Sequence, residues 1–216
     1  GSSRYSIPKG RTRYFLHELM KQKPKNPNEY CLTAFYSMRA NLFRWKKPET
    51  DIRSLTRIFY VNVHDSGKDN IKLISETAMK YKLSGVQKTT TDDHYTRPQA
   101  QAYMIYDNPD KYLDNYDVFR NVFFNARKTI IVAKDENDLF SKDTINDGYN
   151  FSIGSRSDEL YQKHGVMLLR YSGNGKWINR KFERVSHDAM VFNDEALLNE
   201  NRFIRETPPN ILRFFN

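Results

Sequence analysis

The densest group of side chains able to do chemistry is the run Asp92-Asp93-His94. Carboxylates and imidazole hold divalent metal ions, and paired carboxylates with such an ion suit the hydrolysis of a phosphodiester bond. His64 or Asp65 would supply a third ligand. Because short acidic runs are also common in surface turns, two interpretations stay open: a metal-dependent nuclease site and an ordinary acidic turn.

A second group lies between residues 166 and 184, where basic residues are interleaved with aromatic ones. The sequence Ser-Gly-Asn-Gly at 172–175 separates two runs of strand-forming residues and is typical of a β-hairpin turn. Cationic side chains beside aromatic rings can contact a phosphodiester backbone and stack on unpaired bases. The residues expected to contact nucleic acid here are Arg170, Lys176, Trp177, Arg180, Lys181 and Arg184.

The alternation of side chains along a strand gives a further expectation for this hairpin. Successive side chains point to opposite faces of a sheet. Trp177 and Lys181 are therefore expected on one face. Arg180 and Phe182 are expected on the other. The competing interpretation is a solvated hairpin whose aromatic rings belong to the core.

A third group, residues 74–89, has the pattern of a DNA-binding helix-turn-helix. Ala78 would be the small residue where two helices cross, and Ser84 would cap the second helix. Such a second helix presents its first residues to the major groove of DNA, where amide groups read adenine edges and Lys or Thr suits phosphates. The residues expected to make these contacts are Gln87, Lys88 and Thr89. The alternative is an ordinary helix followed by a loop.

Sequences typical of cofactor and metal sites are missing. The run Gly173-Asn174-Gly175-Lys176 ends like a phosphate-binding loop, but Trp177 stands where a Ser or Thr would hold magnesium. The chain has no GxGxxG or HExxH sequence and no paired cysteines for zinc. The sequence therefore assigns no cofactor, no resident metal and no catalytic residue.

The charge of the chain favours a polyanionic partner. The 216 residues include 35 Lys and Arg against 26 Asp and Glu, which gives a formal net charge of +9. This excess favours nucleic acid before an anionic membrane face, and a role in solubility alone is the alternative. The 14 Phe and 14 Tyr supply the bulky groups of a folded core, despite a mean hydropathy of −0.79.

Cysteine usage and hydropathy bear on the compartment and on further partners. The single cysteine, Cys31, excludes an internal disulfide bond, which favours a reducing compartment such as the cytoplasm or nucleus. No apolar run approaches the length of a bilayer span, so no membrane partner is expected. A protein partner or a homo-oligomer stays open. The abundance of Asn, Lys, Tyr and Ile suits the AT-rich genome of a virus, phage or mobile element.

The helices that must position these groups are predicted from periodicity and capping. Asn26 can cap a helix that has Pro27 in its first turn, and apolar residues then follow one stripe as far as Trp45. Further helices are expected at 14–20, at 71–83 with Gly85 closing it, in several pieces over 98–126, and at 195–199.

Strands are predicted where β-branched and aromatic residues concentrate. They are expected at 58–63, 129–133, 149–153 and 189–192 and in the hairpin, whereas the acidic stretch 135–147 is expected to be a loop.

Together these elements predict an α+β fold with a helical N-terminal half, a smaller mostly antiparallel sheet and a basic C-terminal hairpin. One compact domain is expected over residues 4–216, and any division falls near residue 127, between a helical part (4–127) and a strand-rich part (128–216). The expected function is nucleic-acid binding. The alternatives are a metal-dependent nuclease or other nucleic-acid-processing enzyme, and a structural or protein-interaction module.

Overall fold

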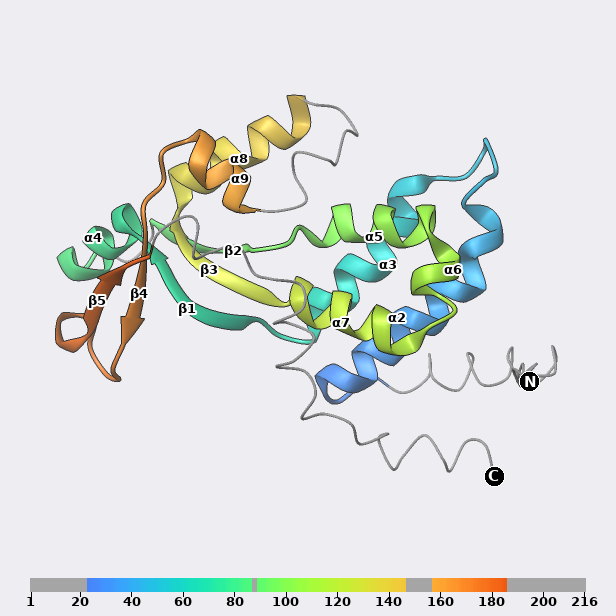
Figure 1. Cartoon of the computed structure of the whole chain (residues 1–216), viewed down its shortest axis with the longest axis horizontal. Helices are drawn as coiled ribbons and strands as arrows, with labels where there is room; N and C mark the ends of the chain where they lie inside the picture. The colour runs from blue at the N-terminus through green and yellow to red at the C-terminus, as the bar shows by residue number, and fades with distance from the viewer. Residues whose placement is uncertain (1–22, 87–88, 147–156, 186–216) are drawn as a thin grey trace.

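The fold is α+β, with helices gathered at one end and a sheet at the other (Figure 1). The computed structural model of the chain describes residues 23–86, 89–146 and 157–185. The helical end consists of α2 (Pro27–Asn41), the short 3-10 helix η1 (Leu42–Arg44), α3 (Ile52–Asp65), α5 (Pro98–Asp107), α6 (Pro109–Tyr112) and α7 (Tyr116–Ala126).

The sheet of the described residues has the strand order β2-β3-β1-β4-β5. The strands are β1 (Asp69–Ser75), β2 (Thr90–His94), β3 (Lys128–Ala133), β4 (Leu168–Ser172) and β5 (Lys181–Arg184). Only the central pair, β1 with β3, is parallel, and the other three pairings are antiparallel. The predicted mostly antiparallel sheet is therefore confirmed. Since β1 and β2 both precede residue 127, that position does not divide helices from strands.

Helices cover both faces of the sheet. Helices α8 (Lys134–Asn146) and α9 (Ser157–Lys163) lie on one face, where Phe140 and Tyr161 pack on Ile130 of β3 (Figure 1). Helix α4 (Glu76–Ser84) lies on the other, where Ala78 packs with Ile74 of β1 and with β4. Neighbouring residues of a strand thus enter different cores, as the pleat requires.

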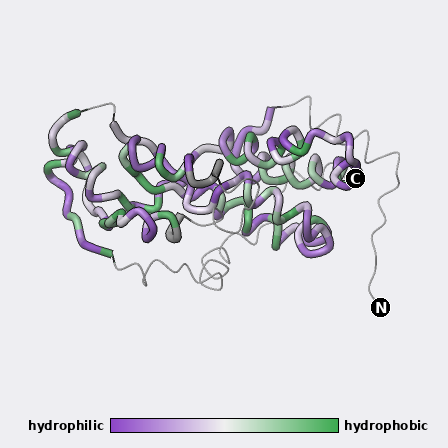
Figure 2. Tube along the Cα trace, turned by 90° about the horizontal axis from the view of Figure 1, so that it is seen from above, coloured by the Kyte–Doolittle hydropathy of each residue, from purple (hydrophilic) through white to green (hydrophobic). Residues whose placement is uncertain are grey.

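The helical end has its own core, which is rich in aromatic rings. Phe119 of α7 is fully buried, with its ring centroid 5.2 Å from that of Phe35 and 5.8 Å from that of Phe59. Each of these residues lies on the apolar stripe of its helix, so the three helices meet along their stripes. Figure 2 shows hydrophobic and hydrophilic residues interleaved along the elements, as expected when each element buries one face.

Several predicted elements are confirmed. Asn26 caps α2 by accepting a hydrogen bond from the backbone N of Glu29 at 3.0 Å, and Pro27 is the first residue of the helix. Helix α7 buries Phe119 and Phe123 on the predicted face, and β3 matches the predicted strand. These elements were predictable because their signals are local.

The predicted strand at 58–63 is wrong, because these residues lie within helix α3. The side chains of Leu55, Phe59 and Val63 recur every four residues and are all buried. Asp51 caps the helix by accepting a hydrogen bond from the N of Arg53 at 3.0 Å. Burial of this helical stripe outweighs the strand propensity of the local run.

Two further expectations are corrected. The predicted helix 71–83 divides into strand β1 and helix α4, with Ser75 as the N-cap residue of α4. The predicted acidic loop 135–147 forms most of helix α8, because Asp135 and Glu136 lie at the positive end of the helix dipole and Phe140 is buried. The expectations for 14–20, 149–153, 189–192 and 195–199 lie outside the described residues.

Candidate functional site

The predicted C-terminal hairpin is present, and β4 and β5 pair with Arg170 opposite Glu183 and Tyr171 opposite Phe182. The connection is longer than a tight turn, because Trp177–Asn179 form the 3-10 helix η2 before β5 begins. Strand alternation therefore does not extend through 177–180, and the predicted assignment of faces is wrong. The rings of Trp177 and Phe182 lie on the same side, with their centroids 6.4 Å apart.

The aromatic rings of the hairpin pack on one another and against α4. The ring of Trp177 lies 5.1 Å from that of Tyr171, and Lys82 of α4 places its Nζ 5.7 Å from the Trp177 centroid. Tyr171 is buried and belongs to the core beneath α4, with Trp177 and Phe182 partly buried against it. These contacts favour a structural role for Trp177 over the predicted contact with nucleic acid.

Arg180 also has a structural role. Its guanidinium carbon lies 4.0 Å from the ring centroid of Trp177, and its Nε and Nη2 donate hydrogen bonds to the carbonyl of Gly175 at 3.3 and 3.1 Å. Gly175 has φ +81, a conformation that favours glycine, so Arg180 closes a turn that the sequence specifies.

The remaining cationic residues of the hairpin are exposed, and we call them the hairpin rim. In the pairing of β4 with β5, Arg170 lies opposite Glu183. Because side chains alternate along a strand, Lys181 points to the same face of the sheet as Glu183 and Arg170, and Arg184 points to the opposite face. None of these side chains forms a hydrogen bond or ion pair with another described residue. Lys80 lowers the pKa of the Glu76 carboxyl in α4, and Arg184 lies near enough to help lower it. The hairpin rim consists of Arg170, Lys176, Lys181 and Arg184.

The helix-turn-helix predicted for residues 74–89 is wrong, because this segment contains one helix. Ser84 is the last residue of α4 rather than the cap of a second helix, and Gly85 turns the chain at φ +76. Strand β2 begins at Thr90, so too few residues remain for a recognition helix. The carbonyl of Thr89 accepts a hydrogen bond from the N of Lys134, which places Thr89 beside the start of α8. Gln87 and Lys88 lie outside the described residues.

A pocket of about 270 Å³ lies where β2 leads into α5, between the sheet and the helical end. The whole run Asp92-Asp93-His94 contributes to its lining. Sequence reasoning missed the other contributors, although the dipeptide Arg97-Pro98 is a usable signal because proline is frequent in the first turn of a helix. These contributors are Tyr60 of α3, Arg97, the first turn of α5 and Asn137 of α8.

The two carboxylates of the pocket have different partners. Oδ2 of Asp92 lies 3.0 Å from Nζ of Lys68, in a partly exposed ion pair. Asp93 is only 5% exposed, and its Oδ2 accepts a hydrogen bond from the hydroxyl of Tyr161 at 2.7 Å. The two carboxylates point to opposite faces of β2, as alternation requires.

His94 is held by the end of α7. Its Nδ1 lies 2.7 Å from the carbonyl oxygen of Ala126, so Nδ1 carries a proton and donates it in this contact. Burial lowers the pKa of His94, against the opposing effects of this hydrogen bond and of the Asp93 carboxylate. The imidazole is therefore neutral at neutral pH, with the lone pair on Nε2.

Arg97 also lines this pocket, and part of its guanidinium has no hydrogen-bond partner among the residues that the structure describes. Its Nε and Nη2 are buried and form no hydrogen bond with the described part of the chain. Arg97 is also the N-cap residue of α5, and its side chain makes no capping hydrogen bond. Arg97 and the uncapped N-terminus of α5 therefore both line one pocket.

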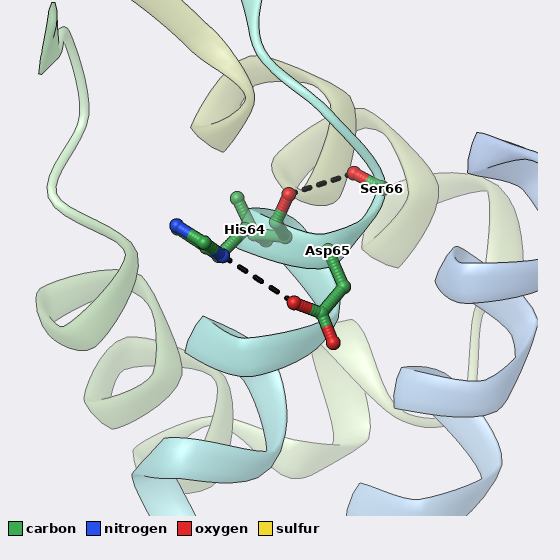
Figure 3. Close-up of polar contacts among 4 residues, drawn as sticks. His64, Asp65 and Ser66 are labelled. Atoms are coloured by element: carbon green, nitrogen blue, oxygen red, sulfur yellow. Dashed lines mark hydrogen bonds and ion pairs between the residues drawn. The ribbon is translucent and has the colours of Figure 1, made fainter.

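The predicted third metal ligands form a pair of their own. At the end of α3, Nδ1 of His64 lies 3.3 Å from Oδ1 of Asp65, and the hydroxyl of Ser66 donates to the carbonyl of Val63 (Figure 3). Both members of the pair are about half exposed. Within the described ranges, no three His, Cys, Asp or Glu side chains are grouped so that they could hold a metal ion. Metal-dependent cleavage stays a prediction.

Comparison with known proteins gives no guide to function. No protein-family model, no curated protein and no solved structure matches the chain. No helix among the described residues is long and apolar enough to cross a membrane.

Proposed function

We propose that the protein binds nucleic acid through the hairpin rim. The single observation that carries the proposal is the exposure of four cationic side chains around the β4–β5 hairpin, none of which forms a hydrogen bond or ion pair with another described residue. Unpaired cations on a rigid strand pair can each neutralise a phosphate and release a condensed counterion. The acidic Glu183, opposite Arg170, is the one carboxylate within the hairpin.

The rigidity of the hairpin supports this role. Arg180 and the ring cluster of Tyr171, Trp177 and Phe182 hold the hairpin against α4, so the rim cations start from a fixed backbone. A fixed backbone lowers the ordering cost of binding. Contacts to phosphates from such a surface position a nucleic acid without reading its sequence, so we propose binding without strong base specificity.

A rival explanation concerns the position of β5 at the edge of the sheet. Natural proteins place charged residues, lysine above all, on edge strands, where they prevent association with other sheets. This explanation predicts no affinity for a polyanion. It also predicts that removal of the rim charges promotes self-association.

The test is the salt dependence of binding to a short fluorescent oligonucleotide, offered as single-stranded and duplex DNA and RNA. The double variant Lys181→Gln, Arg184→Gln should weaken binding. It should also lower the slope of log affinity against log salt by about 0.7 to 0.9 for each phosphate that the variant no longer neutralises. The matched control is Lys46→Gln, Lys47→Gln, which removes the same charge from exposed residues near the end of η1.

The control decides between a local surface and overall charge. If the control lowers the slope as much as the rim variant, the hairpin is not the binding surface. Absence of salt-sensitive binding by the unaltered chain, together with self-association of the rim variant in sedimentation, would favour the edge-strand explanation.

A further inference from the structure

We propose that the pocket between β2 and the N-terminus of α5 is a binding site for a phosphate group, held by Arg97 and by first-turn amides of α5. The proposal is independent of the hairpin rim. The same chemistry belongs to free phosphate, to a nucleotide and to the end of a nucleic-acid strand, and the experiment below distinguishes these sources.

The guanidinium of Arg97 has hydrogen-bond donors without a partner in the described ranges. Buried N–H groups almost always have a partner, yet both Nε and Nη2 of Arg97 are buried without one among the described residues. These two nitrogens lie on the same edge of the guanidinium and donate in parallel. That edge matches two oxygens of a phosphate or carboxylate, which is the geometry of a bidentate contact.

The start of α5 supplies further hydrogen-bond donors to the pocket. The helix has ten residues, begins at Pro98 and has no side-chain cap, and Gln99 and Ala100 of its first turn line the pocket. The first N–H groups of a helix have no partner within the helix, and they lie at the positive end of its dipole. An anion in front of them is stabilised by both effects.

The carboxylates in the pocket limit what the ligand can be. Asp92 is compensated in part by Lys68 at 3.0 Å, and Asp93 by the hydroxyl of Tyr161 at 2.7 Å. Their remaining negative charge disfavours a second charge on the ligand. We therefore expect the site to bind the singly ionised form of a phosphate, which inorganic phosphate, a nucleoside monophosphate and a diester all supply, more tightly than the dianion.

The size of the pocket and its lining suit a phosphate with a substituent. Its volume of about 270 Å³ is just below the usual range for small-molecule sites and larger than a bare phosphate group. Tyr60, which is 44% exposed, lines the pocket and stacks on the ring of His64 with the centroids 6.2 Å apart. An exposed ring pair beside an anion site provides a surface on which a base can stack.

The test is calorimetric titration of the full chain with inorganic phosphate, with adenosine monophosphate and with a short oligonucleotide. Binding of phosphate by the unaltered chain is expected, with Arg97→Gln weakening it at least about tenfold, because the variant cannot form the charge-assisted hydrogen bonds. Arg97→Lys should retain part of the affinity but not the bidentate contact. The matched control is Arg57→Gln, which removes an exposed guanidinium from α3 outside this pocket.

A second variant keeps the test decisive if Arg97→Gln does not fold. Asp92→Asn removes a negative charge from the pocket and frees Lys68, so phosphate should bind several-fold more tightly. Tighter binding of the monophosphate than of inorganic phosphate assigns the site to nucleotides. Tighter binding of the oligonucleotide assigns it to strands.

Two results would overturn the proposal: no heat of binding at millimolar phosphate, or equal affinities of Arg97→Gln and the unaltered chain. The rim variant Lys181→Gln, Arg184→Gln should leave phosphate binding unchanged. Loss of phosphate binding in that variant would show that the rim, and not the pocket, holds the anion. A failure of either proposal can thus be recognised separately.

Discussion

The hydroxyl of Ser75 donates a hydrogen bond of 2.6 Å to Oε2 of Glu136 and so joins the end of β1 to the first turn of α8. The same hydroxyl accepts a hydrogen bond from the N of Ala78 and caps α4. The same carboxylate oxygen accepts one from the N of Ala133, at the end of β3. The side chains of Ser75 and Glu136 therefore accept hydrogen bonds from backbone N–H groups at the start of α4 and at the end of β3, and they join these ends to each other.

Replacement of Ser75 by Ala should lower the free energy of unfolding by about 1 to 3 kcal/mol, because it removes a helix cap and a hydrogen bond to a carboxylate together. Ser75 is fully buried, so water cannot replace the hydroxyl. Urea denaturation followed by circular dichroism measures the change. The control is Ser84→Ala, which removes an exposed hydroxyl at the other end of α4 and should cost less than about 0.5 kcal/mol. Equal effects of the two substitutions would show that the cap and the hydrogen bond with Glu136 together contribute no more than an exposed hydroxyl.

The fold could be predicted from the sequence where local signals and tertiary packing agree. The cap at Asn26, the strand at 129–133 and the hairpin around Gly173 and Gly175 have such signals, and all are present. The helix α3 was mispredicted because the strand-forming run 58–63 conflicts with the four-residue recurrence of Leu55, Phe59 and Val63, and burial of that recurrence in the core decides for the helix. The division at Ser75 was missed because it depends on Glu136, a residue distant in sequence.

The candidate sites were predictable only in part. Sequence reasoning found the hairpin and its exposed cations, but the 3-10 helix at Trp177–Asn179 places Trp177 and Phe182 on one side, which alternation excluded. Sequence reasoning also identified the acidic run of β2, but it did not predict the pocket that this run lines. Arg97 and Tyr60 are 37 positions apart in the sequence, and only the meeting of α3 with the start of α5 brings them to one pocket.

The low pKa of His94 makes stability depend on pH. Because burial lowers its pKa below the ordinary value of 6.5, the unfolded chain binds a proton at His94 that the folded chain does not. This lowered pKa therefore has no effect on the stability of the fold above the unfolded pKa. It destabilises the fold as pH falls from 6.5 toward the folded pKa.

The variant His94→Asn tests this dependence, since the amide of Asn can donate to the carbonyl of Ala126 as Nδ1 does. The decrease in unfolding free energy between neutral and mildly acidic pH should be smaller in the variant than in the unaltered chain. Urea titrations at both pH values measure the difference, and the remaining histidines are common to both proteins. An identical decrease would mean that another group is responsible.

Arg180 should matter to the hairpin and not only to its charge. Arg180→Ala removes the contact with the Trp177 ring and two hydrogen bonds to Gly175, and we expect it to cost about 1 to 2 kcal/mol. Lys181→Ala removes the same charge from an exposed position and should change stability by less than about 0.5 kcal/mol. Tryptophan fluorescence during denaturation follows the hairpin when both variants also carry Trp45→Phe, because Trp177 is then the single tryptophan of the chain. Equal effects would show that Arg180 is a rim cation like its neighbour.

The thiol of Cys31 should be inert in the folded chain. Cys31 is fully buried in the helical core, and burial raises its pKa to about 12, against the weaker lowering effect of a hydrogen bond with Tyr116. The thiolate is the reactive form, and at mildly alkaline pH it is therefore a minute fraction of a side chain that reagents cannot reach. A thiol-specific chromogenic reagent should react with the denatured chain and not measurably with the native one. Rapid reaction of the native chain would mean that α2 and α7 separate often enough to expose the core, because Cys31 on α2 packs with Ala126 and Phe123 of α7 in that core.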